Sequence, residues 1–566
     1  MPRPPTSTRR VVRPASAESW FQQAVFYAID VGSFRDSNED GYGDLRGVAE
    51  SLAYLQRLGV DAIWLLPFYT TPNRDNGYDV SDYFAIDPRY GTFGDFVDLI
   101  DEARLRGIRV VVDLVVNHTS NEHPWFRSAR KGLPNRFRDY YIWSDSPPPP
   151  GKQPKSIFSD RVPVVWTWDE SAASYYYHQF YPFQPALNHF NPRVRDEVRR
   201  IIAFWLRLGV AGFRVDAAPH LISPPLPGGP QDPIDILRDY RRQELGAKGD
   251  AILVGEADVP PDQLANLMGD DALQLLFNFM LNGHFFLAMA RGSADPIVKS
   301  MRAIPDVEGA TWANFLRNLD EVDLERLSPS EQQEVFARFA PDPESRIYGR
   351  GIRRRLAPML GGDRRRLELA YAILLSLPGS PVIVYGDEIG MGDDLSLPER
   401  TALRTAMQWS RGPTGGFSDA DDVELGVPLI RDGAFGLDRV NVHDQEREPG
   451  SLLSWLTEAI RVRRYTPELL LGSDDLRSLG HGSVLARTVE DGHGPVVALH
   501  NLSDRPVTLS RRQIGAHDER FRTLLAPDDA QPLPGDARGI TLEPCGYRWL
   551  RLETPGDEEG PAGSRR

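Results

Sequence analysis

Cysteine, long apolar runs and positive charge are all scarce in this chain of 566 residues. Its one cysteine, Cys545, excludes a disulfide within the chain, which favours a reducing compartment and a cytoplasmic protein. No apolar run approaches the ~18 residues of a membrane span, and the Arg- and Pro-rich segment 1–16 lacks the apolar core of a secretory signal. A net charge of −15 disfavours nucleic acid and anionic membranes as partners, because both select basic surfaces.

Strand-like and helical patterns alternate along most of the chain. Apolar residues at helical spacing predict helices over 45–58, 93–106 and 194–208. Alternation of strand and helix predicts βαβ units and a parallel sheet. The strands number eight, as a closed (β/α)8 TIM barrel requires, and we expect them at 24–31, 61–66, 108–116, 211–215, 251–255, 273–277, 311–316 and 381–385.

The alternation breaks in two places. Residues 119–187 contain many aromatics, a run of prolines and no clear helix, which is too long for an ordinary loop and predicts a small inserted domain after strand three. Short strands between turn residues follow from about 469, which predicts a C-terminal antiparallel β-sandwich. The predicted division is a tail at 1–16, the barrel at 17–118 and 188–468, the inserted domain at 119–187, the sandwich at 469–554 and a tail at 555–566.

Several of the predicted strands end on charged or polar side chains. They run into Asp113 and Asn117-His118, Arg214 and Asp216, Glu256, and Asn318-Leu319-Asp320. In a closed parallel barrel these ends meet at one mouth, where such enzymes keep their chemistry. Each alone has a structural explanation, such as a cap, a turn or an ion pair. Several carboxylates at one mouth repel and desolvate one another, so together they predict a catalytic site.

Arg214 and Asp216 point to the same side of their strand, because side chains alternate along a strand. A neighbouring cation would keep Asp216 ionised, as a nucleophile requires, although a structural ion pair at a strand end gives the same pattern. Two carboxyls about 5 to 5.5 Å apart suit retaining glycoside transfer. One attacks the anomeric carbon, and the other, kept protonated by burial beside other anions, protonates the leaving oxygen.

These segments resemble the alpha-amylase family of glycoside hydrolases and transglucosylases over nearly the whole chain. The matching motifs are DLVVNH (113–118), GFRVD (212–216), GE (255–256) and NLD (318–320), in the family's order. The resemblance implies that Asp216 is the nucleophile, Glu256 the acid/base and Asp320 the carboxylate that binds the 2- and 3-hydroxyls of the sugar. It further implies that Arg214 orients the nucleophile, His118 binds the 6-hydroxyl, Tyr78 stacks on the sugar and Asp75 binds the 4-hydroxyl.

Longer segments resemble one branch of this family, which holds trehalose synthases and oligo-1,6-glucosidases. They are QPALN (184–188), GIRRRLAP (351–358), YGDEIGMGDD (385–394) and RTAMQWS (404–410), with Ala186 where the branch often has Asp. The resemblance implies an intramolecular transglucosylase that interconverts maltose and trehalose. A hydrolytic α-glucosidase on short α-glucans stays open, as does a sugar-binding protein with a weakened barrel. The expected partner is a small sugar, and the sequence is silent on oligomeric state.

One position departs from the family pattern. The residue before the third carboxylate is normally His, and here it is Leu319. The imidazole would donate to the hydroxyls that Asp320 binds, and such contacts strengthen in the transition state. By analogy with oxyanion donors, its loss reduces the rate by about 10²–10³. We therefore expect slow turnover or a shifted specificity.

A calcium loop is expected after the first strand. Asp36, Asn38, Asp40, Tyr42 and Asp44 offer oxygen ligands at alternating positions, with Gly at the sixth, although the bidentate Glu of an EF-hand is missing. The same loop binds structural Ca²⁺ in the branch that the chain resembles. The alternative is an ordinary polar turn between strand and helix.

Overall fold

A computed structural model describes the chain over residues 17–131, 135–154, 156–158, 160–221, 233–245, 249–420, 423–470, 475–490 and 494–554. The two predicted tails therefore lie outside the described residues. The centre of the molecule is a closed barrel of parallel strands in the order β1-β16-β12-β11-β10-β9-β5-β2. Their bounds are β1 Phe26–Ile29, β2 Ala62–Leu65, β5 Arg109–Leu114, β9 Gly212–Val215, β10 Ile252–Gly255, β11 Leu275–Phe277, β12 Thr311–Phe315 and β16 Ser380–Val384. The predicted (β/α)8 barrel is confirmed.

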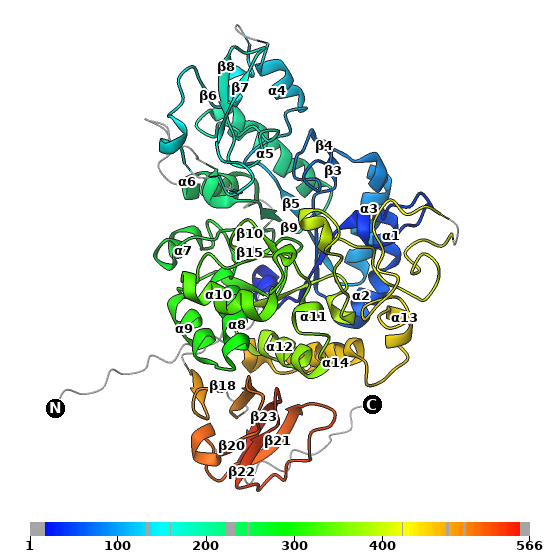
Figure 1. The fold of residues 1–566 in the computed structure, drawn as a ribbon, viewed down its shortest axis with the longest axis vertical. Helices are drawn as coiled ribbons and strands as arrows, with labels where there is room; N and C mark the ends of the chain where they lie inside the picture. The colour runs from blue at the N-terminus through cyan, green and yellow to red at the C-terminus, as the bar shows by residue number, and fades with distance from the viewer. Residues whose placement is uncertain are drawn as a thin grey trace, which may run out of the picture.

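Helices surround this barrel, as its alternating sequence pattern predicts (Figure 1). Most of these helices pack an apolar side on the strands and turn a polar side to water, whereas α8 and α12 are buried over most of their length. The helices are α1 Leu45–Glu50, α2 Leu52–Leu58, α3 Phe93–Leu105, α5 Pro192–Arg207, α6 Pro233–Tyr240, α7 Pro261–Leu267, α8 Phe279–Arg291, α9 Asp295–Ala303, α10 Pro329–Phe339, α11 Leu356–Met359, α12 Arg364–Ser376, α13 Val442–Gln445 and α14 Leu452–Arg464.

The structure corrects two of the predicted helical patterns. The single helix expected over 45–58 is two helices, α1 and α2, which meet at Ser51, whose hydroxyl donates to the carbonyl of Gly47 at 2.8 Å. Hydroxyl groups that bond to the preceding turn often bend a helix. The inserted segment, expected to lack a helix, contains α4 Pro124–Ala129. Pro124 stands at its first turn, and the ring of His123 caps it by accepting from the backbone N–H of Trp125.

The segment between β5 and α5 forms a small antiparallel sheet of β6 Trp143–Ser144, β8 Ser174–Tyr177 and β7 Trp166–Asp169. Because it leaves the barrel from the carboxyl end of β5, it lies over the mouth, at the cyan and teal end of Figure 1. Short hairpins also border the mouth: β3 Tyr69–Thr70 with β4 Asp82–Ile86, and β13 Val322–Asp323, β14 Arg346–Ile347 and β15 Gly351–Ile352.

The C-terminal region is an antiparallel sandwich at the opposite end of the molecule (Figure 1). A five-stranded sheet in the order β17-β18-β19-β23-β21 faces the pair β20-β22 across a separate apolar core. The strands are β17 Leu476–Leu479, β18 Val484–Val489, β19 Val496–Asn501, β20 Val507–Ser510, β21 Arg520–Leu525, β22 Gly539–Leu542 and β23 Tyr547–Glu553. The predicted antiparallel fold is confirmed here. None of the helices in the described ranges is long and apolar enough to cross a membrane.

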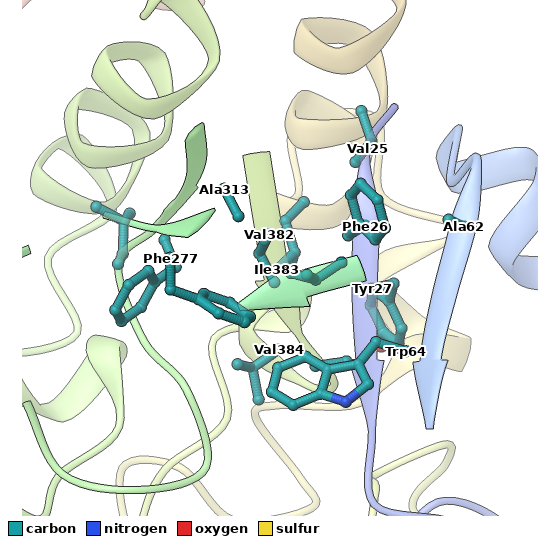
Figure 2. Packing of buried hydrophobic residues seen from close by; sticks show 14 of the residues in the cluster. Val25, Phe26, Tyr27, Ala62, Trp64, Phe277, Ala313, Val382, Ile383 and Val384 are labelled. Atoms are coloured by element: carbon teal, nitrogen blue, oxygen red, sulfur yellow. The ribbon is translucent and has the colours of Figure 1, made fainter. Parts of the chain in front are cut away.

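Apolar side chains fill the inside of the barrel. Figure 2 shows residues of β1, β2, β11, β12 and β16 converging there, with the Trp64 indole among them. Phe26, Phe277 and Val382 line the small space inside, together with Arg214. Since this packed layer closes the barrel, the polar side chains that follow the strands are left at its mouth.

Candidate active site

Arg214, on β9, is the centre of the polar cluster at the mouth. Its side chain is 3% exposed, and Nη1 lies 2.7 Å from an oxygen of Asp113 and 2.7 Å from one of Asp216. Its Nη2 lies 2.7 Å from Glu256. The strand register explains the convergence, because Arg214 is paired with Asp113 on β5 and with Val254 on β10, two residues before Glu256. One buried guanidinium therefore joins three carboxylates from three neighbouring strands.

The guanidinium of Arg214 sets an upper limit on the distance between the two predicted catalytic carboxyls. Since both lie 2.7 Å from one guanidinium, Asp216 and Glu256 are within about 8 Å of each other. This is below the roughly 9.5 Å at which two carboxyls still flank one glycosidic bond. Glu256 also accepts from the backbone N–H of Ala217 at 3.1 Å, and Ala217 has a positive φ of 45°. The turn after Asp216 thus holds the second carboxyl beside the first.

The surroundings of Asp216 and Glu256 give their carboxyls different pKa values. Burial raises the pKa of Asp216 to about 6, against the lowering effect of Arg214. Burial, with the anions of Asp216 and Asp320 nearby, raises the pKa of Glu256 to about 7, again opposed by Arg214. Near pH 6.5 the favoured state has Asp216 ionised and Glu256 protonated. A nucleophile and a general acid require these two states respectively.

Asp320 is held by two further arginines. Arg400 and Arg404 lie 3.1 Å and 3.2 Å from the same oxygen of Asp320. Burial raises the pKa of Asp320, but the arginines around it outweigh that effect, and the net pKa is lowered. Asp320 is therefore a permanent anion and an acceptor for hydroxyl groups. Sequence reasoning assigned neither arginine to the site; only the RTAMQWS segment, which begins at Arg404, pointed to it.

The predicted sugar contacts Asp75, Tyr78 and His118 lie in the same region. Tyr78 Oη is 3.4 Å from Arg214 Nη1, and Asp75 accepts from the side-chain amide of Gln184 at 2.7 Å. His118 Nε2 bonds to the carbonyl of Tyr78 at 3.1 Å, and burial lowers the pKa of His118 to about 4. The ring is therefore neutral near pH 7. Its Nδ1 has no hydrogen-bond partner among the described residues, which leaves that atom for a ligand.

Leu319 supplies no polar group to the site. It is 3% exposed and belongs to the main apolar core, and its carbonyl lies 3.4 Å from Arg404 Nε. Two other histidines have structural surroundings. Both nitrogens of His189 are engaged, with the carbonyl of Val116 and the hydroxyl of Tyr240. His220 stands next to the site, and its carbonyl accepts from Asn117 at 2.6 Å.

The predicted calcium loop has the conformation of a turn closed by its own side chains. Asp36 accepts from the backbone N–H groups of Asn38, Glu39 and Gly41, and Asp40 accepts from that of Tyr42. Asp44 caps α1. The side chains of this loop offer hard oxygen atoms, the type of ligand that Ca²⁺ prefers. Across the described ranges, the group of acidic side chains whose oxygens converge within 4.8 Å is a different one, Asp258, Asp323 and Glu325.

Comparison with known proteins identifies the family. The model of the alpha-amylase catalytic domain matches residues 29–303 and 352–472, more than half of the chain. A trehalose synthase of Pimelobacter sp. (strain R48) is 39% identical over 556 residues, which cover 95% of this chain and 96% of that protein. Trehalose synthase/amylase TreS of Mycolicibacterium smegmatis is 38% identical, covering 96% and 94%. Oligo-1,6-glucosidases match at lower identity, 32% for that of Parageobacillus thermoglucosidasius.

Among solved structures, an inactive double mutant of MutB in complex with isomaltulose superposes with a TM-score of 0.77. It is 26% identical and covers 95% of this chain and 100% of that one. The chain belongs to the alpha-amylase family and is an enzyme of that family.

Proposed function

We propose that this enzyme interconverts maltose and trehalose by intramolecular transfer of a glucosyl group through a covalent intermediate on Asp216. The observation that carries the proposal is the buried Arg214 fork, which joins Asp216 and Glu256 at one mouth. The near-full-length similarity to trehalose synthases supports the choice of substrate. The complex of MutB with isomaltulose supports a small sugar as the ligand.

In the first step, a carboxylate oxygen of Asp216 attacks the anomeric carbon of the non-reducing glucose of maltose. The glycosidic bond breaks, and Glu256 gives its proton to the departing oxygen. Asp320 accepts from the 2- and 3-hydroxyls of the transferred sugar, while His118, Tyr78 and Asp75 hold its other faces. In the second step the freed glucose turns, and its anomeric hydroxyl attacks the glucosyl ester. Glu256 takes that proton, Asp216 leaves, and trehalose forms.

Transfer rather than hydrolysis requires that the freed glucose stays and that water stays out. Two contacts link the inserted segment to other loops of the barrel. Arg350 Nη1 donates to the carbonyl of Ile157 at 2.9 Å, and the hydroxyl of Tyr181 donates to Glu399 at 2.9 Å. These contacts favour the transglucosylase over the alternative, a hydrolytic α-glucosidase, in which water would take the glucosyl group.

Incubation of the enzyme with maltose, followed by NMR, tests this function. Trehalose in excess of free glucose supports the isomerase, glucose alone supports the hydrolase, and no turnover supports a sugar-binding protein. Asp216→Asn is the matched control, because it keeps the shape of the side chain and removes the nucleophile. An Asp216→Asn protein that still makes trehalose would contradict the assignment.

We also propose that Asp36, Asn38, Asp40, Tyr42 and Asp44 hold a structural Ca²⁺. The support is the oxygen-rich donor set at alternating positions of the sequence. A cytoplasmic location is proposed as well, on the strength of the single cysteine. Measurement of the melting temperature with EDTA and with added Ca²⁺ tests the first proposal.

A further inference from the structure

Asp30 is a carboxylate at the mouth of the barrel that has no role in the steps above. It directly follows β1, so it stands at the same end of the barrel as Asp113, Asp216 and Glu256. Its side chain is 17% exposed, and one of its oxygens lies 3.9 Å from Arg404 Nη1. Removing a carboxylate from water is costly unless it is paired, and Arg404 is the cation that Asp30 contacts.

Arg404 connects Asp30 to the third carboxylate of the site. Its Nη2 lies 3.2 Å from Asp320, and its Nη1, on the Asp30 side, lies 3.4 Å from the carbonyl oxygen of Asn76. Arg404 is buried, and burial by itself lowers its pKa. The carboxylates of Asp320 and Asp30 outweigh burial, and the net pKa is raised. The guanidinium is therefore a cation shared between two carboxylates.

The turn after β1 also holds the backbone around Arg404. The hydroxyl of Ser33 donates to the carbonyl of Arg404 at 3.3 Å, and the backbone N–H of Met407 donates to the carbonyl of Ser33 at 2.8 Å. Asp30 belongs to the same turn, because its carbonyl accepts from the backbone N–H of Ser33 at 3.1 Å. One short turn thus positions both the backbone and the side chain of Arg404, and Asp30 contributes the charge.

Arg404 is the cation through which Asp30 can act on the site. Two further arginines influence Asp30 electrostatically, and each of them has a carboxylate of its own. The pairs are Arg89 with Asp87 at 2.8 Å and Arg355 with Asp387 at 3.2 Å.

Both arginines that hold Asp320 are shared with a second carboxylate. Arg400 Nη1 and Arg404 Nη2 contact the same oxygen of Asp320, and Arg400 Nε lies 3.3 Å from Glu321. Two cations that belonged to Asp320 alone would neutralise it and make it a weak acceptor. Because Glu321 and Asp30 each take a share of one cation, Asp320 keeps its negative charge for the sugar hydroxyls.

We propose that Asp30 is a positioning residue, which acts through Arg404 to keep Asp320 a strong acceptor for the 2- and 3-hydroxyls of the transferred sugar. This role rests on the proposed glucosyl transfer, in which Asp320 binds those hydroxyls. Hydrogen bonds to the 2-hydroxyl strengthen in the transition state. In Asp30→Asn, Asp320 is the one carboxylate left to Arg404, so the acceptor weakens and kcat falls more than KM changes.

A pair of aryl glucosides isolates this effect. p-Nitrophenyl α-D-glucoside carries the 2-hydroxyl, p-nitrophenyl 2-deoxy-α-D-glucoside lacks it, and released nitrophenol reports both reactions. In Asp30→Asn the ratio of their kcat/KM values should fall at least about five-fold, with the loss mainly in kcat for the glucoside. Both rates come from one protein sample, so poor folding of the variant lowers them alike and leaves the ratio intact. An unchanged ratio overturns the proposal.

Two further variants separate charge from shape. Asp30→Glu keeps the carboxylate, and its ratio should stay within about two-fold of the wild-type value. Asp87→Asn is the matched control, because Asp87 is a buried carboxylate that pairs with Arg89 rather than with Arg404. A ratio that falls as far in either of these variants as in Asp30→Asn overturns the proposal. The readout needs no trehalose, so a failure of the maltose–trehalose proposal would appear separately, in the maltose incubation.

Discussion

Neutralising Asp113 should shift the acidic limb of the pH–rate profile. Activity requires ionised Asp216 and protonated Glu256, whose pKa values burial raises to about 6 and about 7. Turnover of maltose should therefore rise as pH increases through the first value and fall as it increases through the second. At the maximum, near pH 6.5, about 60% of the molecules carry both groups in the required state, and two units higher about 3% do.

The size of the shift follows from the Arg214 fork. Nη1 touches Asp113 and Asp216, so the two touched oxygens are no more than about 5.4 Å apart. Two charges at that separation repel by about 3 kcal/mol at an effective dielectric constant of 20, which is about two pKa units. Burial raises the pKa of Asp113 itself to about 6, so it is only partly charged at the acidic limb. In Asp113→Asn we expect the acidic limb about one unit lower, and the basic limb lower too, because Asp113 also interacts with Glu256.

The assay is kcat/KM for maltose across the pH range, followed by NMR. Glu388→Gln is the control, because Glu388 is another buried carboxyl whose pKa burial raises to about 7. It accepts from Tyr27 and Tyr54, each at 2.7 Å, and forms no ion pair with Arg214. An acidic limb that stays in place or moves upward in Asp113→Asn refutes the reasoning. If the acidic limb also moves in Glu388→Gln, that limb does not report the titration of Asp216.

Three further changes have defined outcomes. Leu319→His should raise kcat for maltose by up to about 10²–10³, because it restores a donor to the hydroxyls that Asp320 binds; no gain in rate counts against the hypothesis. Arg350→Ala removes the link to Ile157, so the share of free glucose among the products should increase several-fold by NMR, and an unchanged ratio would mean that this contact does not exclude water. If Ca²⁺ occupies the loop, EDTA should lower the melting temperature of the wild type by several degrees and leave Asp36→Ala unaffected; equal responses of the two proteins would disprove the site.

The barrel could be predicted because its strands are buried on both faces. Such strands are uninterrupted apolar runs, and the run predicted over 211–215 contains β9, Gly212–Val215. The carboxyl ends of parallel strands share one edge, so the meeting of Asp216 with Glu256 followed from topology. The sequence therefore predicts which charged residues gather at the mouth of the barrel.

Features that depend on loops could not be predicted in this way. Arg400 and Arg404 reach Asp320 from positions 80 and 84 residues later in the chain, in and directly after the short 3-10 helix Glu399–Leu403, which is too short for its periodicity to be read from the sequence. The register of strand β21, Arg520–Leu525, shifts between Thr523 and Leu525, and such an irregularity interrupts the alternation by which a strand is predicted. The break at Ser51 arises from one side-chain hydrogen bond, which leaves the apolar pattern unchanged.

Trapping the glucosyl-enzyme would test the central claim most directly. The enzyme is reacted with 5-fluoro-α-D-glucosyl fluoride, whose ester intermediate breaks down slowly, and is then digested and analysed by peptide mass spectrometry. The account predicts a fluoroglucosyl adduct on Asp216, absent from Asp216→Asn. An adduct on another carboxylate, or release of the sugar without any adduct under conditions of rapid turnover, would contradict it.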